Sequence, residues 1–197
     1  MTDSDHRQNG AQTGAPHGDT EWVFAYGSLM WDPGFEPAEI ALARLDGYAR
    51  SFCLRSVEHR GTHDLPGLVL GLDADDGAHC RGLALRMPAA DRDWILAYLR
   101  GRELVTDAYA ESTLPLTLAD GRRVDAVTYV MRRDHWQYAG GLPAGEQAAI
   151  IAAAHGGRGP NADYLFNTAR HLAQIGLHDR VMDELSDAVR RILAARA

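Results

Sequence analysis

Apolar residues follow strand-like patterns over the first two thirds of the chain. Residues 22–25 are four apolar residues in a row, which is typical of a strand buried on both faces. Residues 47–54 alternate aromatic or apolar with small or polar side chains, the period of a half-buried strand. The apolar runs 68–72 and 82–87 flank a polar stretch, residues 73–77, and this arrangement predicts a hairpin.

Two more strands are expected further along the chain, giving about six in all. Residues 109–118 and 124–131 are rich in β-forming residues, and Asp120-Gly121 between them is a strong hairpin signal. The acidic stretch at 73–77 lacks the alternating carboxylates and terminal Glu of a calcium loop, so turn chemistry is the favoured interpretation.

Helical periodicity appears once between the strands and dominates the last third. Pro88 is expected to start a helix that runs to about Gly101, with the apolar positions Trp94, Ile95, Tyr98 and Leu99. Residues 146–154 predict a second helix, Asn161 is expected to cap a third, and Val181, Leu185, Val189 and Ile192 mark a fourth. Strands followed by helices indicate an α+β fold.

Composition indicates a single domain after a polar tail. Residues 1–20 contain almost no large apolar residue, so we expect a disordered tail, followed by one domain over residues 21–197. The formal net charge of −7 and the lack of a basic run argue against nucleic-acid or anionic-membrane partners. Without a long apolar run or a secretion signal, the expected location is the cytoplasm, where Cys53 and Cys80 would be reduced core residues.

The first strand ends in a loop with the features of an anion site. Gly27 permits an unusual backbone turn, so the N–H groups of Gly27, Ser28 and Leu29 can face one point. A carboxylate suits such a cluster of donors. An ordinary strand-to-loop turn is the competing interpretation.

Glu103 is the strongest candidate for an acid or base. In a helix that continued past Leu99, it would lie on the apolar face, four residues after Leu99 and eight after Ile95. Burial disfavours an ionised carboxylate and raises its pKa, so Glu103 is either a base or the partner in a structural ion pair. If Gly101 ended the helix early, Glu103 would turn outward.

Other kinds of site find little support. His59 and His63 are four residues apart, but no further ligand pattern completes a metal site. Ser28 lacks the second glycine of a nucleophile elbow, and residues 156–160 lack the Lys-Ser/Thr of a phosphate loop. We therefore expect neither a metal nor a nucleotide cofactor.

Several motifs together resemble the ChaC-type γ-glutamylcyclotransferases. Tyr26-Gly27-Ser28-Leu29, with its aromatic flanks at 22–24 and 31–35, is similar to the family's N-terminal signature. Tyr98-Leu99, Arg102-Glu103 and Tyr109 are similar to the segment that holds the family's catalytic glutamate, although the spacer at residues 104–108 is longer than in many eukaryotic members. Residues 58–62 and 159–165 extend the likeness.

The resemblance implies a fold, an activity and a set of site residues. The fold is a small mixed β-barrel with flanking helices, and the activity is the cofactor-free cleavage of glutathione to 5-oxoproline and Cys-Gly with Glu103 as acid and base. The substrate-binding residues would be Ala25, Tyr26, Gly27, Ser28, Leu29, Met30, Arg60, Tyr109 and Tyr164. Two alternatives stay open: a different γ-glutamyl peptide or amine as substrate, and a non-catalytic binding or regulatory protein on the same fold.

Overall fold

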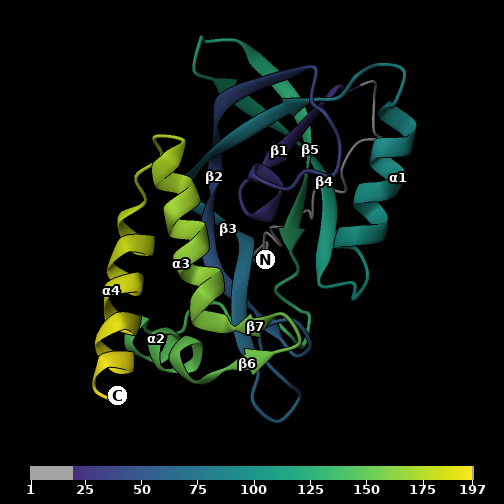
Figure 1. Cartoon of the computed structure of the whole chain (residues 1–197). Helices are drawn as coiled ribbons and strands as arrows, with labels where there is room; N and C mark the ends of the chain where they lie inside the picture. The colour runs from purple at the N-terminus through teal and green to yellow at the C-terminus, as the bar shows by residue number, and fades with distance from the viewer. Residues whose placement is uncertain (1–19, 197) are drawn as a thin grey trace, which may run out of the picture.

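Five strands close into a mixed barrel in the computed structural model, which describes residues 20–196 (Figure 1). The strands are β1 (Trp22–Ala25), β2 (Glu39–Ser56), β3 (Gly67–Arg86), β4 (Tyr109–Leu118) and β5 (Arg123–Met131). Their order is β1-β3-β2-β4-β5, with antiparallel neighbours throughout. The barrel closes where β5 pairs in parallel with β1 and with β3. The α+β class and the mixed barrel are thereby confirmed.

The short strand β1 is buried on both faces, as its unbroken apolar run predicts. Phe24 packs on one face with barrel residues such as Leu45 and Leu72. Val23 and Ala25 point the other way, into a cluster that includes the buried side of the first helix. A strand between two apolar layers has no face for polar residues.

The hairpin expected around residues 73–77 is wrong. β3 is one strand of 20 residues that pairs with β2 on both sides of this stretch. Asp46 faces His79 and Tyr48 faces Ala74, so only Gly47 separates these pairs on β2, whereas residues 75–78 separate them on β3. The polar residues are thus held in a bulge, since continued pairing with the long strand β2 outweighs the local turn signal. The described chain therefore has five barrel strands instead of six.

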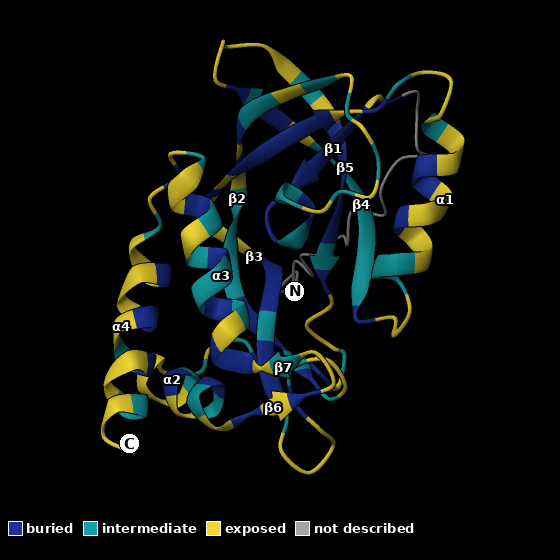
Figure 2. Ribbon diagram, in the orientation of Figure 1, coloured by how far each residue is buried: buried dark blue, intermediate teal, exposed yellow. Residues whose placement is uncertain are grey.

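Four helices flank the barrel, and they lie on two sides of it (Figure 1). α1 (Arg92–Glu103) covers one side, while α2 (Ala144–Ala153), α3 (Asn161–Gln174) and α4 (Arg180–Ala194) gather on the other. A 3-10 turn, η1 (Ser28–Met30), follows β1, and the two-residue strands β6 (His155–Gly156) and β7 (Gly159–Pro160) pair just before α3. The helices turn their buried faces to the barrel or to one another, and their outer faces are exposed (Figure 2).

Two helix starts differ from the expectation. α1 begins at Arg92, because the carbonyl of Pro88 accepts the Asp91 N–H in a separate turn (3.0 Å). Asn161 is the first residue of α3 but does not cap it. Its buried side chain instead bonds to the backbone of Leu68. Asn161 Nδ2 donates to the Leu68 carbonyl, and Asn161 Oδ1 accepts from the Leu68 N–H, both at 2.7 Å.

The expected tail, residues 1–20, lies outside the described residues except at its end. Thr20 is buried, its hydroxyl donates to the Asp125 carbonyl, and its own carbonyl accepts from Arg92 Nε (3.0 Å). Cys53 and Cys80 are both free and buried. No helix within residues 20–196 is long and apolar enough to cross a membrane.

Candidate active site

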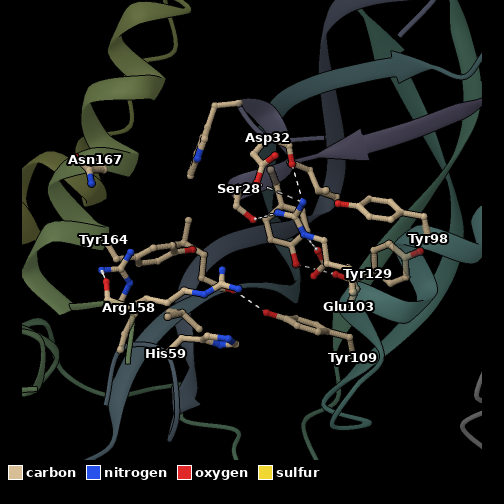
Figure 3. A pocket seen from close by; sticks show the side chains of 18 residues that line it. Ser28, Asp32, His59, Tyr98, Glu103, Tyr109, Tyr129, Arg158, Tyr164 and Asn167 are labelled. Atoms are coloured by element: carbon tan, nitrogen blue, oxygen red, sulfur yellow. Dashed lines mark hydrogen bonds and ion pairs between the residues drawn. The ribbon is translucent and has the colours of Figure 1, made fainter. Parts of the chain in front are cut away.

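A cavity of about 580 Å³ opens between the barrel, the end of α1 and the start of α3 (Figure 3). Segments far apart in the sequence supply its wall. The lining residues are Tyr26, Gly27, Ser28, Leu29, Trp31, Asp32, His59, Arg60, Val69, Leu70, Tyr98, Arg102, Glu103, Tyr109, Tyr129, Arg158, Tyr164 and Asn167.

Glu103 enters this cavity from the last turn of α1. The helix continues through Gly101, so Glu103 shares the face of the buried residues Ile95 and Leu99. Its side chain is 18% exposed. Burial raises the pKa of Glu103 above its ordinary value, and the neighbouring Arg102 guanidinium, 3.2 Å from Oε1, only partly opposes this. A carboxyl group with a raised pKa is a stronger base once it ionises.

Arg102 joins the end of α1 to the loop that follows β1. Its guanidinium donates to Ser28 Oγ at 3.0 Å and to the Asp32 carbonyl at 2.7 Å. The Asp32 carboxylate, also on the cavity wall, is largely exposed, with 72% of its side chain open to solvent. Glu103 is therefore the buried carboxylate among the lining residues.

Four tyrosines of the cavity wall remain neutral near pH 7. Tyr26 donates its hydroxyl to the Tyr129 carbonyl (2.9 Å), and Tyr109 donates to the Leu70 carbonyl (2.8 Å). Burial raises the pKa of Tyr26, Tyr109 and Tyr129, and it raises that of Tyr164 to about 12. Neutral phenols can donate hydrogen bonds but are poor bases near pH 7. Glu103 is therefore the buried candidate base of the wall, where His59 is exposed.

The loop after β1 lines the cavity with Gly27, Ser28 and Leu29. The η1 turn begins its hydrogen bonding with the Met30 N–H, which donates to the Gly27 carbonyl at 3.0 Å. The amides of Gly27, Ser28 and Leu29 precede that first bonded amide, as at the start of any helical turn. Gly27 adopts φ −130° and ψ −133°. A Cβ there would meet only Leu70 Cδ1, at 4.0 Å.

Ala25 and Met30, both expected to bind substrate, do not line the cavity. Ala25 is fully buried, pairs with Leu83 on β3 and packs toward α1. Met30 points into apolar clusters on the other side of the η1 turn. The remaining candidates of that loop, Tyr26, Gly27, Ser28 and Leu29, do reach the wall.

Arg60 and Tyr164 meet on the α3 side of the cavity. The Arg60 guanidinium lies over the Tyr164 ring, 5.7 Å from its centroid, and donates to the carbonyls of Arg158 (2.7 Å) and Pro160 (3.2 Å). Arg60 thus ties its own loop to the segment that leads into α3.

Sequence reasoning assigned no role to several lining residues. Asn167 could have been found, because it lies three residues after Tyr164 and so shares its helix face. Tyr129 and Arg158 carry no local signal, since only the closing of the barrel and the docking of α3 bring them to the cavity. Among residues 20–196, no group of three His, Cys, Asp or Glu side chains is arranged to hold a metal ion.

A family model described as ChaC-like protein matches residues 21–192. The chain belongs to the ChaC-like family. The match covers every strand of the barrel, all four helices but the last two residues of α4, and every residue of the cavity wall.

Curated ChaC-like relatives carry names that state an activity. The glutathione-specific γ-glutamylcyclotransferase of Escherichia coli is 38% identical over 173 residues, covering 88% of this chain and 74% of that protein. The human glutathione-specific γ-glutamylcyclotransferase 1 is 31% identical, covering 87% and 79%. A crystal structure of a glutathione-specific γ-glutamyl cyclotransferase from yeast matches with a TM-score of 0.77 at 23% identity, covering 86% and 95%, and shows the same fold.

Proposed function

We propose that this ChaC-like protein is a γ-glutamylcyclotransferase that converts glutathione to 5-oxoproline and cysteinylglycine. The observation that carries the proposal is the buried Glu103 carboxyl, which faces a cavity walled by neutral tyrosines and by residues 27–29 of the loop after β1. The names of the bacterial and human relatives point to the same reaction and the same substrate.

The reaction is intramolecular. The substrate α-amine attacks the γ-carbonyl carbon, a five-membered lactam closes, and the bond from that carbon to the cysteine nitrogen breaks. Enclosing the γ-glutamyl arm in a folded conformation supplies much of the acceleration, because well-oriented intramolecular reactions reach effective molarities of about 10⁵–10⁸ M. No water and no cofactor enters the balance.

Glu103 moves the protons. An α-amine has a pKa near 8 and is mostly an ammonium group at neutral pH, so it must lose a proton before it can attack. In total two protons pass from the attacking nitrogen to the departing cysteine nitrogen. Glu103 carries them as base and then as acid, a role that typically contributes about 10²–10⁴-fold.

The loop after β1 would hold the γ-glutamyl α-carboxylate through the amides of Gly27, Ser28 and Leu29. Arg102 would add charge on the same side, since it is bonded to Ser28 Oγ. Tyr109, Tyr164 and Arg60 would line the remainder of the substrate, with Arg60 nearest the peptide that leaves. We place the reaction in the cytoplasm, where two free buried thiols are the ordinary state.

A product assay tests the proposal. The purified protein should release 5-oxoproline from glutathione and do so less well from other γ-glutamyl dipeptides and γ-glutamylamines. Glu103→Gln keeps the size of the side chain but removes the base, so it should fold and lose about 10²–10⁴-fold in kcat. Activity on a γ-glutamylamine alone would move the assignment to another substrate. No 5-oxoproline from any compound would favour a binding protein.

A further inference from the structure

Arg50 on β2 lies behind the loop of residues 26–30 that follows β1, called the substrate loop below, with its charge almost wholly buried. Its side chain is 4% exposed, and its guanidinium reaches three elements of the fold. Nε donates to the Tyr26 carbonyl at 2.7 Å, one terminal nitrogen pairs with Asp179 Oδ2 at 2.9 Å, and the other donates to the Arg81 carbonyl at 2.5 Å. Only a planar fork with donors on several edges makes all three contacts.

The Tyr26 carbonyl belongs to the peptide group that also contains the Gly27 N–H. This peptide is trans, as are all those of residues 20–196, and in a trans peptide the C=O and N–H bonds point in opposite directions. A hold on the carbonyl from one side therefore fixes the direction of the N–H on the other. Tyr26 and Gly27 both line the cavity, whereas Arg50 does not.

We propose that Arg50 is a positioning residue, which aims the Gly27 amide at the α-carboxylate of the substrate by holding the Tyr26 carbonyl from behind. Arg50 does not touch the substrate. The inference rests on the proposed function, because the α-carboxylate that the Gly27 amide would bind is that of glutathione.

Asp179 completes the arrangement. A buried guanidinium needs a paired carboxylate, and Asp179 supplies it from the start of α4, where its other oxygen accepts the Met182 N–H at 3.2 Å. The cap of α4 and the substrate loop are thus held by one side chain. This explains why an arginine with no place on the cavity wall lies under the loop.

The sequence permits a direct observation of the peptide group concerned. Tyr26-Gly27 is the only Tyr-Gly step in the chain, so protein labelled with carbonyl-¹³C tyrosine and ¹⁵N glycine gives one signal in a carbonyl-selected amide spectrum. Glu103→Gln, which should turn glutathione over about 10²–10⁴-fold more slowly, is the form to titrate. At saturating glutathione the Gly27 amide proton should move downfield, as expected for a new bond to a carboxylate. If the Gly27 signal did not move at saturating glutathione, the proposal would be overturned, and this test needs no substitution of Arg50.

Arg50→Lys tests the positioning itself. Lysine keeps the charge beside Asp179 but loses the fork, so the Tyr26 carbonyl should be released and its ¹³C signal should shift. Because the carboxylate is held in the ground state and the transition state alike, KM for glutathione should rise about tenfold or more while kcat changes little. A merely structural role would lower the active fraction, and hence kcat, at unchanged KM.

A matched control and a second compound separate the outcomes. Arg44→Lys, on the same strand with its side chain 54% exposed, should keep wild-type KM. The glutathione analogue with a 4-aminobutanoyl arm lacks the α-carboxylate. It should therefore inhibit Arg50→Lys as strongly as it inhibits the wild type. An unchanged KM in folded Arg50→Lys would refute the positioning role alone, whereas wild-type protein without 5-oxoproline release would refute the proposed function.

Discussion

Glu103 shows how one residue can join stability to chemistry. Its carboxyl lies at the end of an amphipathic helix, on the face that also carries Ile95 and Leu99. Burial there removes the hydration of the ionised carboxylate, and the attraction of Arg102 offsets only part of that loss of free energy. The same loss makes the carboxylate more basic, which proton transfer to and from an amine requires.

The first prediction concerns stability as a function of pH. Because the folded-state pKa of Glu103 is raised above the unfolded value, its contribution to stability is fully present below the unfolded pKa and is lost as pH rises through the folded pKa. Glu103→Gln does not titrate. It should therefore melt above wild type at pH 7, by about 2–4 °C for each kcal/mol gained, and the gap should close toward pH 4. Calorimetry across this range checks it. A variant that melts lower at pH 7 would mean that the pair with Arg102 outweighs burial.

Local sequence could identify some residues of the site and had to miss others. Glu103 was recognisable because a carboxylate at the helical spacing of Ile95 and Leu99 is unusual. Ala25 and Met30 were included as parts of one motif, yet successive residues of a strand or turn point to different sides, so a contiguous motif contains residues that face the core. Arg50 gave no signal, since the role proposed for it depends on a contact with the Tyr26 carbonyl, 24 residues earlier in the chain.

At the scale of elements, the long pair β2 and β3 explains the main error of the sequence interpretation. Short-range turn residues at 73–77 predicted a hairpin, whereas β2 offers pairing partners from Glu39 to Ser56. Pairing over this length fixes the strand as one element and accommodates the extra residues as a bulge. By contrast, Asp120-Gly121 does form its hairpin, with Gly121 at φ +89°, because the strands it joins have each other as partners.

The second prediction separates backbone from side chain in the substrate loop. Gly27→Val should fold, since a Cβ has room there, but its methyl groups would occupy the cavity beside Leu70, and kcat/KM should fall about 100-fold or more. Ser28→Ala loses only the bond from Arg102 and should cost about tenfold or less. Kinetics with glutathione, and circular dichroism for folding, compare the two. The reverse order would place recognition in the serine hydroxyl.

The third prediction concerns the connection between α3 and the barrel. Asn161 replaces a strand neighbour for Leu68, donating to its carbonyl and accepting from its N–H. Asn161→Ala leaves two buried backbone groups without partners and should lower the free energy of unfolding by about 2–4 kcal/mol. Asn167→Ala on the same helix, where the side chain is half-buried, should stay within about 0.5 kcal/mol. Denaturant unfolding measures both, and equal effects would contradict the role given to Asn161.

On the scale of the whole molecule, the cavity exists because separate layers meet. α1 brings Glu103 and Arg102 from one side of the barrel, α3 brings Tyr164 from the other, and the barrel strands supply the floor (Figure 3). Periodicity predicted each helix and most strands, but the way the layers meet is a property of barrel closure. Only the family resemblance supplied that closure before the structure did.

The last prediction locates the N-terminal edge of the folded unit. Residues 2–18 are polar and offer little apolar surface to bury, and the family model begins at residue 21. Deleting residues 2–18 should therefore leave Tm and activity nearly unchanged.

Deleting residues 2–20 is the matched comparison, because it also removes Thr20. That residue bonds to the Asp125 carbonyl at the start of β5 and to Arg92 at the start of α1. The bond of the Thr20 hydroxyl, worth about 0.5–1.5 kcal/mol, is lost outright, while the carbonyl of Met1 takes the place of the Thr20 carbonyl. Tm should therefore fall by a few degrees. Thermal melts and glutathione turnover of both truncations decide the matter. If the shorter deletion already destabilised the protein, residues before Thr20 would have to pack against the domain; if the longer one changed nothing, the edge would lie at Trp22, where β1 begins.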